Sequence, residues 1–213
     1  MASNDEYEIV LIENEIDACL CAKLLAEEFA AHNPLSIFNQ ATAKQSFDQW
    51  AWPFMINALD KKLSFLIGHR STNEIVAVII ASNLFLYCEK HPYDASSPAS
   101  HHPTNDLLAE MLDQFIHPGA TRSKHSGKTL GAQLRTHVCT HARNTKGFQY
   151  AFIQTCNPAT RHIYVKRMNG KEMTILDPAT WVWKKKDDGL SCPFTDYKDE
   201  PIVNIFLNLT KQQ

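Results

Sequence analysis

The chain begins with a strand-like pattern of apolar positions, which is followed by a helix-like pattern. Residues 7–12, YEIVLI, form a short apolar run that is typical of a strand. Apolar residues then recur at helical spacing between positions 21 and 29. The residue before a proline avoids the helical region, so the HNPLS segment at 32–36 predicts the end of this helix.

A second amphipathic pattern covers residues 47–59, where apolar side chains fall at i, i+3, i+4, i+7 and i+8. Thr42 and Gln45 have the spacing of a capping box at its start. Pro53 lies inside the pattern and lacks the backbone N–H that a helix needs. We therefore expect a helix that is kinked or split in two near this proline.

Two strands are predicted next, over residues 63–70 and 74–87, with the short polar turn STN between them. The second run is almost continuously apolar, which favours a position in mid-sheet with both faces covered. Residues 88–105 are rich in Pro, Ser and His and are predicted to be an exposed loop. Residues 106–116 are predicted as a helix, or as a helix followed by a strand.

The second half of the chain returns to a strand and helix alternation. Residues 117–128 are polar and are predicted as loop, and a helix starts at Leu130 and can end at Gly147. The strand FQYAFIQTC follows at 148–156. Asn157 and Pro158 then form an N-cap with a first-turn proline, which predicts another helix up to Asn169-Gly170.

Late strands are predicted at KEMTIL, TWVWKKK and PIVNIFLNLT. Trp181 and Trp183 alternate on one of them, so both either line a pocket for an apolar or aromatic amine or pack in the core. The order of elements predicts a mixed α/β fold in which neighbouring strands pair antiparallel before a later strand–helix unit.

The amino-acid composition excludes some classes of protein but does not indicate a function. The 213 residues are 44% hydrophobic and 21% charged, as in ordinary soluble domains, and predict one domain or at most two. The formal net charge of −2 gives no support for binding to nucleic acid or to an anionic membrane. No apolar run is long enough to span a bilayer, and MASNDEYEIV lacks the apolar core of a signal peptide. With six cysteines and no CxxC pair, we expect reduced thiols and a cytoplasmic protein.

The stretch HSGKTLGAQL, residues 125–134, is the first candidate for chemistry. A small, basic, glycine-bearing loop that enters a helix presents backbone N–H groups where an anion is stabilised. A nucleotide-binding P-loop would need a glycine five residues before Gly127, directly after a strand. Arg122 stands there, and the nearest upstream glycine is Gly119 in a polar segment. The spacing therefore disfavours a nucleoside triphosphate.

SGKTLGA, followed by a helix, a strand and NPATRHIYVKR, resembles the Gcn5-related N-acetyltransferase superfamily. In that family a Q/R-x-x-G-x-G/A loop caps a central helix, and its backbone amides bind the pyrophosphate of acyl-CoA. The motif matches residues 126–131, with Ser126 at the Q/R position and Thr129 at the first glycine. We expect Gly127 to compensate in part for the missing glycine, and the backbone donors remain.

The second half of the resemblance lies downstream. Asn157 follows the predicted strand as an Asn often does in the family, and Tyr164 begins a Y-x-K motif whose expected Gly-Phe is Met168-Asn169. The family's tyrosine protonates the departing coenzyme A thiolate, a role that suits a phenol because its pKa is not far from that of a thiol. The resemblance implies these contacts to coenzyme A: His125, Ser126, Gly127, Lys128, Thr129, Leu130, Gly131, Ala132 and Asn157.

The front of the chain resembles the arylalkylamine N-acyltransferases of animals within this superfamily. FAAHNPLSIF, residues 29–38, is similar to their F-x-x-x-E-P-L segment, whose glutamate is the general base. Asn33 stands at that position and cannot take a proton, whereas its neighbour His32 can. His117, on the expected remnant of the fourth strand, is a second candidate, and a chain of water molecules is a third possibility.

The resemblance implies a single domain over residues 1–213, of α/β class and α+β type, with a polar insertion at 88–125. Its mixed, mostly antiparallel sheet is flanked by helices and splits between strands four and five, where acyl-CoA threads the gap. The implied reaction moves an acetyl or other acyl group from acyl-CoA to a primary amine without a metal. The acceptor is a small-molecule amine or, alternatively, a protein lysine. The competing hypothesis is a catalytically degenerate fold that binds coenzyme A or a protein partner.

Overall fold

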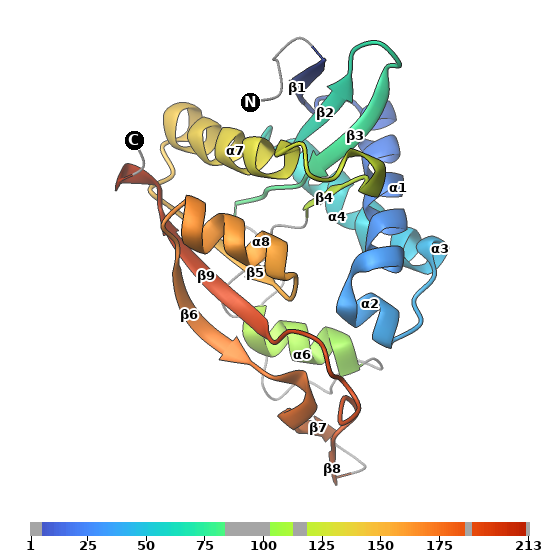
Figure 1. Cartoon of the computed structure of the whole chain (residues 1–213). Coiled ribbons are helices and arrows are strands. Elements are labelled where there is room, and N and C mark those ends of the chain that lie inside the picture. The colour runs from blue at the N-terminus through green and yellow to red at the C-terminus, as the bar shows by residue number, and fades with distance from the viewer. Residues whose placement is uncertain (1–5, 84–102, 113–118, 186–188, 212–213) are drawn as a thin grey trace. The chain divides into compact units, whose positions relative to one another are not determined.

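The computed structural model shows an α/β chain with antiparallel sheets and flanking helices (Figure 1). The residues that it describes are 6–83, 103–112, 119–185 and 189–211. They form two compact units. The first unit contains Met1–Ser82, His117–Ala151 and Asn208–Gln213, and the second contains Asn83–Ile116 and Phe152–Leu207.

The first unit is built on a four-stranded sheet in the order β1-β2-β3-β4, in which every neighbouring pair is antiparallel. Its strands are β1 (Tyr7–Leu11), β2 (Phe65–His69), β3 (Glu74–Ile79) and β4 (Gly119–Thr121). The first three strands confirm the sequence predictions, although β3 ends earlier than expected. The rest of the long apolar run leaves the sheet at Ile80, and its last residues lie outside the described part of the chain.

Helices on one face of this sheet form the first core cluster. The long helix α1 (Glu15–His32) starts at Asn14, whose side chain accepts a hydrogen bond from the N–H of Asp17. Its apolar stripe, including Cys21, Leu24 and Leu25, is fully buried, which confirms the predicted helix. These side chains pack with Leu66, Val78 and Ile80 from the sheet side. The short helix α2 (Pro34–Phe38) follows α1 directly.

The second amphipathic pattern is split, as the proline predicts. It forms α3 (Ala43–Ser46), a π-helical stretch η1 (Phe47–Ala51) and α4 (Trp52–Leu59). Thr42 and Gln45 make both halves of the predicted capping box. Pro53 has no N–H to donate to the preceding turn, which explains why the hydrogen bonds just before it change from the α-helical to the wider π-helical pattern.

The opposite face of the sheet is covered by α7 (Leu130–Lys146), which ends at Gly147 in a left-handed conformation with φ 72°. Leu130, Leu134 and Val138 recur at steps of four along it and pack with Phe65, Ile67, Ala77 and Ile79. Side chains alternate across a strand, so Leu66 and Val78 face the other cluster. The prediction that the second hairpin strand has both faces covered is confirmed.

The fourth strand corrects the sequence prediction. Residues 117–128 are predicted as loop, with a remnant of strand four expected around His117, but β4 lies at Gly119–Thr121 within this segment. Its register sets Gly119 opposite Ile79 and Thr121 opposite Ala77. A Cβ on Gly119 would lie 3.3 Å from the Cγ1 atom of Ile79, so a small residue suits this pairing. Three residues are too few to show an alternating pattern in the sequence.

The second unit contains a three-stranded sheet in the order β5-β9-β6 and a separate two-stranded ribbon, β7-β8. The strands are β5 (Tyr150–Thr155), β6 (Lys171–Leu176), β7 (Trp183–Lys185), β8 (Gly189–Ser191) and β9 (Ile202–Asn208). The remaining helices of the described residues, from both units, are α6 (Pro103–Leu112), η2 (Ser123–His125), α8 (Pro158–His162), η3 (Ile163–Arg167), η4 (Pro178–Thr180) and η5 (Leu209–Lys211).

The two tryptophans of the predicted late strand belong to the core of the second unit, although only Trp183 lies in β7 and Trp181 is the C-cap residue of η4. Trp181 and Trp183 are 7% and 8% exposed, and Trp181 packs against Phe194. The indole N–H of Trp183 donates to the carboxylate of Asp106 on α6 over 2.7 Å. Of the two interpretations of this pair, the structure favours core packing.

Membrane and redox features of the described residues are simple. None of the helices in the described ranges is both long and apolar enough to cross a bilayer. The cysteines that the structure describes, Cys19, Cys21, Cys139, Cys156 and Cys192, are free thiols. Burial raises the pKa of Cys139 to about 12, so this thiol stays protonated near neutral pH.

Candidate active site

The candidate pyrophosphate loop lies in the first unit, between η2 and α7. Thr129 is the N-cap residue of α7, and its carbonyl accepts hydrogen bonds from the N–H groups of Ala132 and Gln133 at 3.0 Å each. Leu130, the first helical residue, is 1% exposed and is anchored in the second core cluster. The burial of Leu130 therefore fixes the start of the helix. The loop has to turn within the residues before Leu130.

Consecutive backbone donors of this loop are free. Among the hydrogen bonds of the described residues, none uses a backbone N–H of Gly127–Gly131 as its donor. A Cβ built on Gly127 meets no heavy atom within 4 Å, so the surface above the loop is open at that point. Unpaired N–H groups at the start of a helix, together with the helix dipole, stabilise a bound anion.

Thr129 adopts a conformation that is unusual for its residue type. Its φ of 62° and ψ of 6° are left-handed, and a β-branched residue pays about 1–2 kcal/mol for this region. Its hydroxyl accepts a hydrogen bond from the side chain of Gln133 over 3.0 Å. Thr129, at the first glycine position of the motif, thus has a left-handed backbone conformation that a glycine would adopt without strain.

The second glycine of the motif, Gly131, lies in a closely packed position. A Cβ on Gly131 would lie 3.0 Å from the Nη1 atom of Arg135 and 3.4 Å from the hydroxyl of Thr121 on β4. The guanidinium of Arg135 is buried and donates to the carbonyl of Gly131 over 2.9 Å. Gly131 therefore lets α7 begin close to β4.

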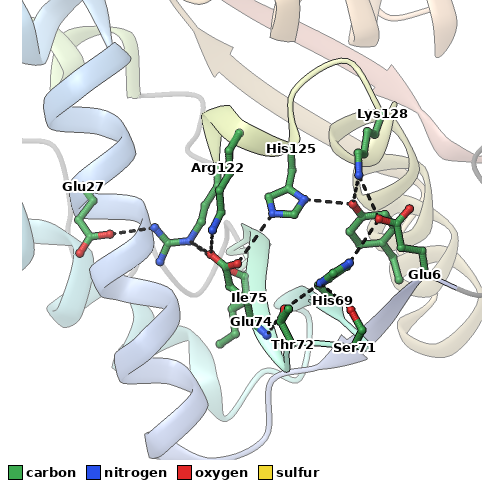
Figure 2. Close-up of polar contacts among 12 residues, drawn as sticks. Glu6, Glu27, His69, Ser71, Thr72, Glu74, Ile75, Arg122, His125 and Lys128 are labelled. Atoms are coloured by element: carbon green, nitrogen blue, oxygen red, sulfur yellow. Dashed lines mark hydrogen bonds and ion pairs between the residues drawn. The ribbon is translucent and has the colours of Figure 1, made fainter.

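Side chains at both ends of the loop reach back to the first strand (Figure 2). His125 is 9% exposed, and its Nδ1 atom lies 3.0 Å from the hydroxyl of Tyr7. The ammonium group of Lys128 donates to the same hydroxyl over 2.5 Å and to Glu6 over 3.1 Å. It also lies 5.1 Å from the centre of the Tyr7 ring, a cation–π distance.

Carboxylates balance the basic side chains around the loop. Lys128 holds the pKa of the Glu6 carboxyl below its usual value, and Lys124, at 2.7 Å, does the same for Glu74. The imidazole of His125 lies 3.9 Å from Glu74, but burial lowers the pKa of His125, which favours the neutral ring near pH 7. With these cations paired, the loop still offers its backbone amides as donors.

The candidate general base lies at the end of α1. The Nε2 atom of His32 is 3.6 Å from the carboxylate of Glu28 one turn earlier, and the His32 side chain is 57% exposed. Asn33, at the position of the family's glutamate, caps α2 by accepting a hydrogen bond from the N–H of Ser36 over 3.1 Å. His117 lies outside the described residues.

Two further candidates lie in the second unit. The side chain of Asn157 accepts a hydrogen bond from the N–H of Thr160 over 3.0 Å and caps α8, as the sequence predicts. Tyr164 is 3% exposed and lies in the π-helical stretch η3 that continues α8. Such π-helical turns are often found at functional sites.

Comparison with protein-family models gives no match, and no curated protein matches the chain by sequence. Solved structures do match. The C-terminal condensation domain of Ebony, in complex with beta-alanyl-dopamine, superposes with a TM-score of 0.74 at 14% identity, over 95% of this chain and 99% of that one. Arylalkylamine N-acetyltransferase 2 from Aedes aegypti gives 0.69 at 15% identity, over 97% and 100%. The polyamine N-acetyltransferase of Drosophila melanogaster gives 0.62 at 14% identity, over 94% and 100%.

The chain has the Gcn5-related N-acetyltransferase fold. This confirms the predicted α/β class and the arylalkylamine-like layout. Strands β4 and β5 belong to different sheets, as expected for this fold.

A glycine lies near the position where the Y-x-K-x-G-F motif expects one. Met168 stands where the motif has glycine. The backbone of Gly170, two positions later, lies close to that of Tyr164, because the N–H of Gly170 donates to the carbonyl of Tyr164 over 2.8 Å. A Cβ on Gly170 would lie 2.9 Å from that oxygen and 2.7 Å from the Cγ2 atom of Ile205. Asn169 takes the left-handed turn before it, with φ 56°. The glycine is present two positions later than sequence matching expects.

Sequence reasoning missed the side chains that hold the loop from the sheet. Tyr7 and His125 are 118 positions apart, and neither Glu6 nor Glu74 belongs to a motif. The one available signal was that Tyr7 opens a predicted strand. For metals, the described residues contain no group of three or more His, Cys, Asp or Glu side chains that could hold an ion.

Replacing Thr129 with glycine should stabilise the protein. Thr129→Gly removes the left-handed strain at the cost of one exposed hydrogen bond, and we expect the free energy of unfolding to rise by about 0.5–1 kcal/mol. Urea denaturation measures this change. Thr140→Gly, in the exposed middle of the same helix, should instead lower it by about 0.3 kcal/mol. A loss of stability at Thr129 equal to that at Thr140 would contradict the strained conformation.

Proposed function

We propose that this protein transfers an acyl group, acetyl in the first place, from acyl-CoA to a primary amine. The observation that carries the proposal is the row of unpaired backbone N–H groups over Gly127–Gly131, at the start of α7, in a chain with the N-acetyltransferase fold. The pyrophosphate of coenzyme A carries the negative charge and the acceptor oxygens that suit such a row.

The residues before the loop favour coenzyme A over a nucleoside triphosphate. A P-loop needs glycine at the position of Arg122. The guanidinium of Arg122 instead donates to the carbonyl of Ile75 over 3.1 Å and pairs with Glu27 at 3.1 Å and with Glu74 at 3.4 Å (Figure 2). With Arg122 held in this way, the segment before Gly127 does not form the glycine-rich loop that encloses a triphosphate in a P-loop protein.

The proposed chemistry is direct transfer. Acetyl-CoA supplies the activated acyl group as a thioester. The neutral amine attacks the thioester carbonyl, so that a C–N bond forms while the C–S bond breaks, and no covalent enzyme intermediate is needed. Tyr164 donates its phenolic proton to the departing sulfur, and His32, or a chain of water molecules, takes the proton that the amine gives up.

The acceptor we propose is a small-molecule amine, with a protein lysine as the alternative. Structures of the same fold include a domain bound to beta-alanyl-dopamine, an agmatine N-acetyltransferase and a polyamine N-acetyltransferase. One observation favours a different function: Asn33 occupies the place of the family's base and serves as a helix cap. A chain that binds coenzyme A without acylating amines is therefore the second candidate.

An acetylation screen tests the proposal. Purified protein is given acetyl-CoA and a panel of arylalkylamines, polyamines and a lysine peptide, and release of the free thiol is followed. We expect turnover with at least one small amine. Tight binding of coenzyme A without turnover on any amine would favour the binding module, and binding of ATP–magnesium alone would contradict both.

Replacing Tyr164 with phenylalanine tests the proton donor. Tyr164→Phe removes only the hydroxyl, so kcat should fall about 100-fold, the usual contribution of a positioned acid. The KM for acetyl-CoA should stay within about twofold because binding is not altered. Tyr150→Phe, at a half-exposed position in β5, is the matched control and should leave kcat unchanged. Equal turnover of Tyr164→Phe and wild type would remove Tyr164 from the mechanism.

A further inference from the structure

We propose that Tyr7 is a positioning residue for the loop: its hydroxyl holds His125–Gly131 in the conformation that binds the pyrophosphate of acyl-CoA. The inference rests on the proposed function, because it assigns how that same loop is kept ready for its ligand. Tyr7 itself need not touch the ligand.

The position of the Tyr7 hydroxyl is set by the core. Tyr7 opens β1 opposite His69, is 8% exposed and belongs to the cluster that α7 buries. Its ring packs against His69 and His125, with ring centres 5.2 Å and 5.9 Å away. Neither the strand nor the ring is free to move, so the hydroxyl is a stationary point beside the loop.

This one hydroxyl is shared by two residues on either side of the turn. His125 comes before Ser126-Gly127 and Lys128 comes after it, and both contact the same oxygen, at 3.0 Å and 2.5 Å (Figure 2). The oxygen therefore closes a bridge across the turn. Within the bridge, Gly127 is left-handed with φ 80°, and a Cβ at that position would meet no neighbour.

The bridge matters because the loop makes few bonds of its own. The N–H of Ser126 donates to the carbonyl of Ser123, and the next donated backbone hydrogen bond is that of Ala132. Between these points the loop has a strained Thr129 and no internal hydrogen bond among the described residues. Loss of the hydroxyl would leave the buried Nδ1 atom of His125 without this partner and let Lys128 move, and the amides would then sample other directions.

The decisive comparison is between wild type and Tyr7→Phe. The phenylalanine keeps the ring and its packing and removes only the shared oxygen. We expect the Kd for coenzyme A, measured by calorimetry, to rise about fivefold, which corresponds to about 1 kcal/mol. With an amine substrate, KM for acetyl-CoA should rise by the same factor while kcat at saturation stays within about twofold.

Tyr197→Phe is the matched control. Tyr197 is 4% exposed, and its hydroxyl donates to the carbonyl of Glu200 over 2.9 Å within the second unit, whereas the loop belongs to the first unit. Both variants lose a phenolic hydroxyl, Tyr7→Phe with its contacts to His125 and Lys128 and Tyr197→Phe with its hydrogen bond to Glu200, so both unfolding midpoints should fall. Only Tyr7→Phe should lose affinity for coenzyme A.

The possible results separate the two claims. Equal Kd values for wild type and Tyr7→Phe would overturn the role of Tyr7 and leave the proposed function standing. An equal loss of affinity in both variants would also overturn it, because the effect would then follow from stability alone. Wild-type protein that binds no coenzyme A would overturn the proposed function, and the inference with it.

Discussion

The burial of Leu130 is the constraint on which the candidate site depends. This residue is both the first of α7 and a fully buried member of the cluster that joins α7 to the sheet. Because Leu130 packs in this cluster as the first residue of α7, it holds the start of the helix against the sheet, and Thr129 takes its left-handed conformation directly before it. The left-handed turn, the free amides behind it and the packing of Gly131 against Thr121 all follow from this placement.

The departures from the family motif look less severe in the structure than in the sequence. Thr129 has the left-handed backbone that the motif's glycine would allow, and a closely packed glycine, Gly170, lies two positions after Met168, where the motif's glycine is expected. In both places the backbone geometry is retained while the residue type or its position has changed. The exception is Asn33, where a helix cap occupies the place of a base and leaves His32, paired with Glu28, as its neighbour.

Local rules predicted most of the elements, and long-range contacts account for what they missed. The capping box at Thr42, the split near Pro53 and the end of α7 at Gly147 depend on neighbours in sequence and were predicted. Strand β4 is held by its register with β3, and its three residues carry no pattern of their own. The contacts of Tyr7 join residues 118 positions apart, so no motif or periodicity could indicate them.

The most direct test of this account follows the backbone amides of the loop by NMR while coenzyme A is added. If the row of free N–H groups binds the pyrophosphate, the amide resonances of Gly127 and Gly131 should move strongly downfield. Pantetheine, which shares the thiol arm but lacks the pyrophosphate, should leave them in place. Saturable binding of coenzyme A with no change at Gly127–Gly131 would contradict the central claim.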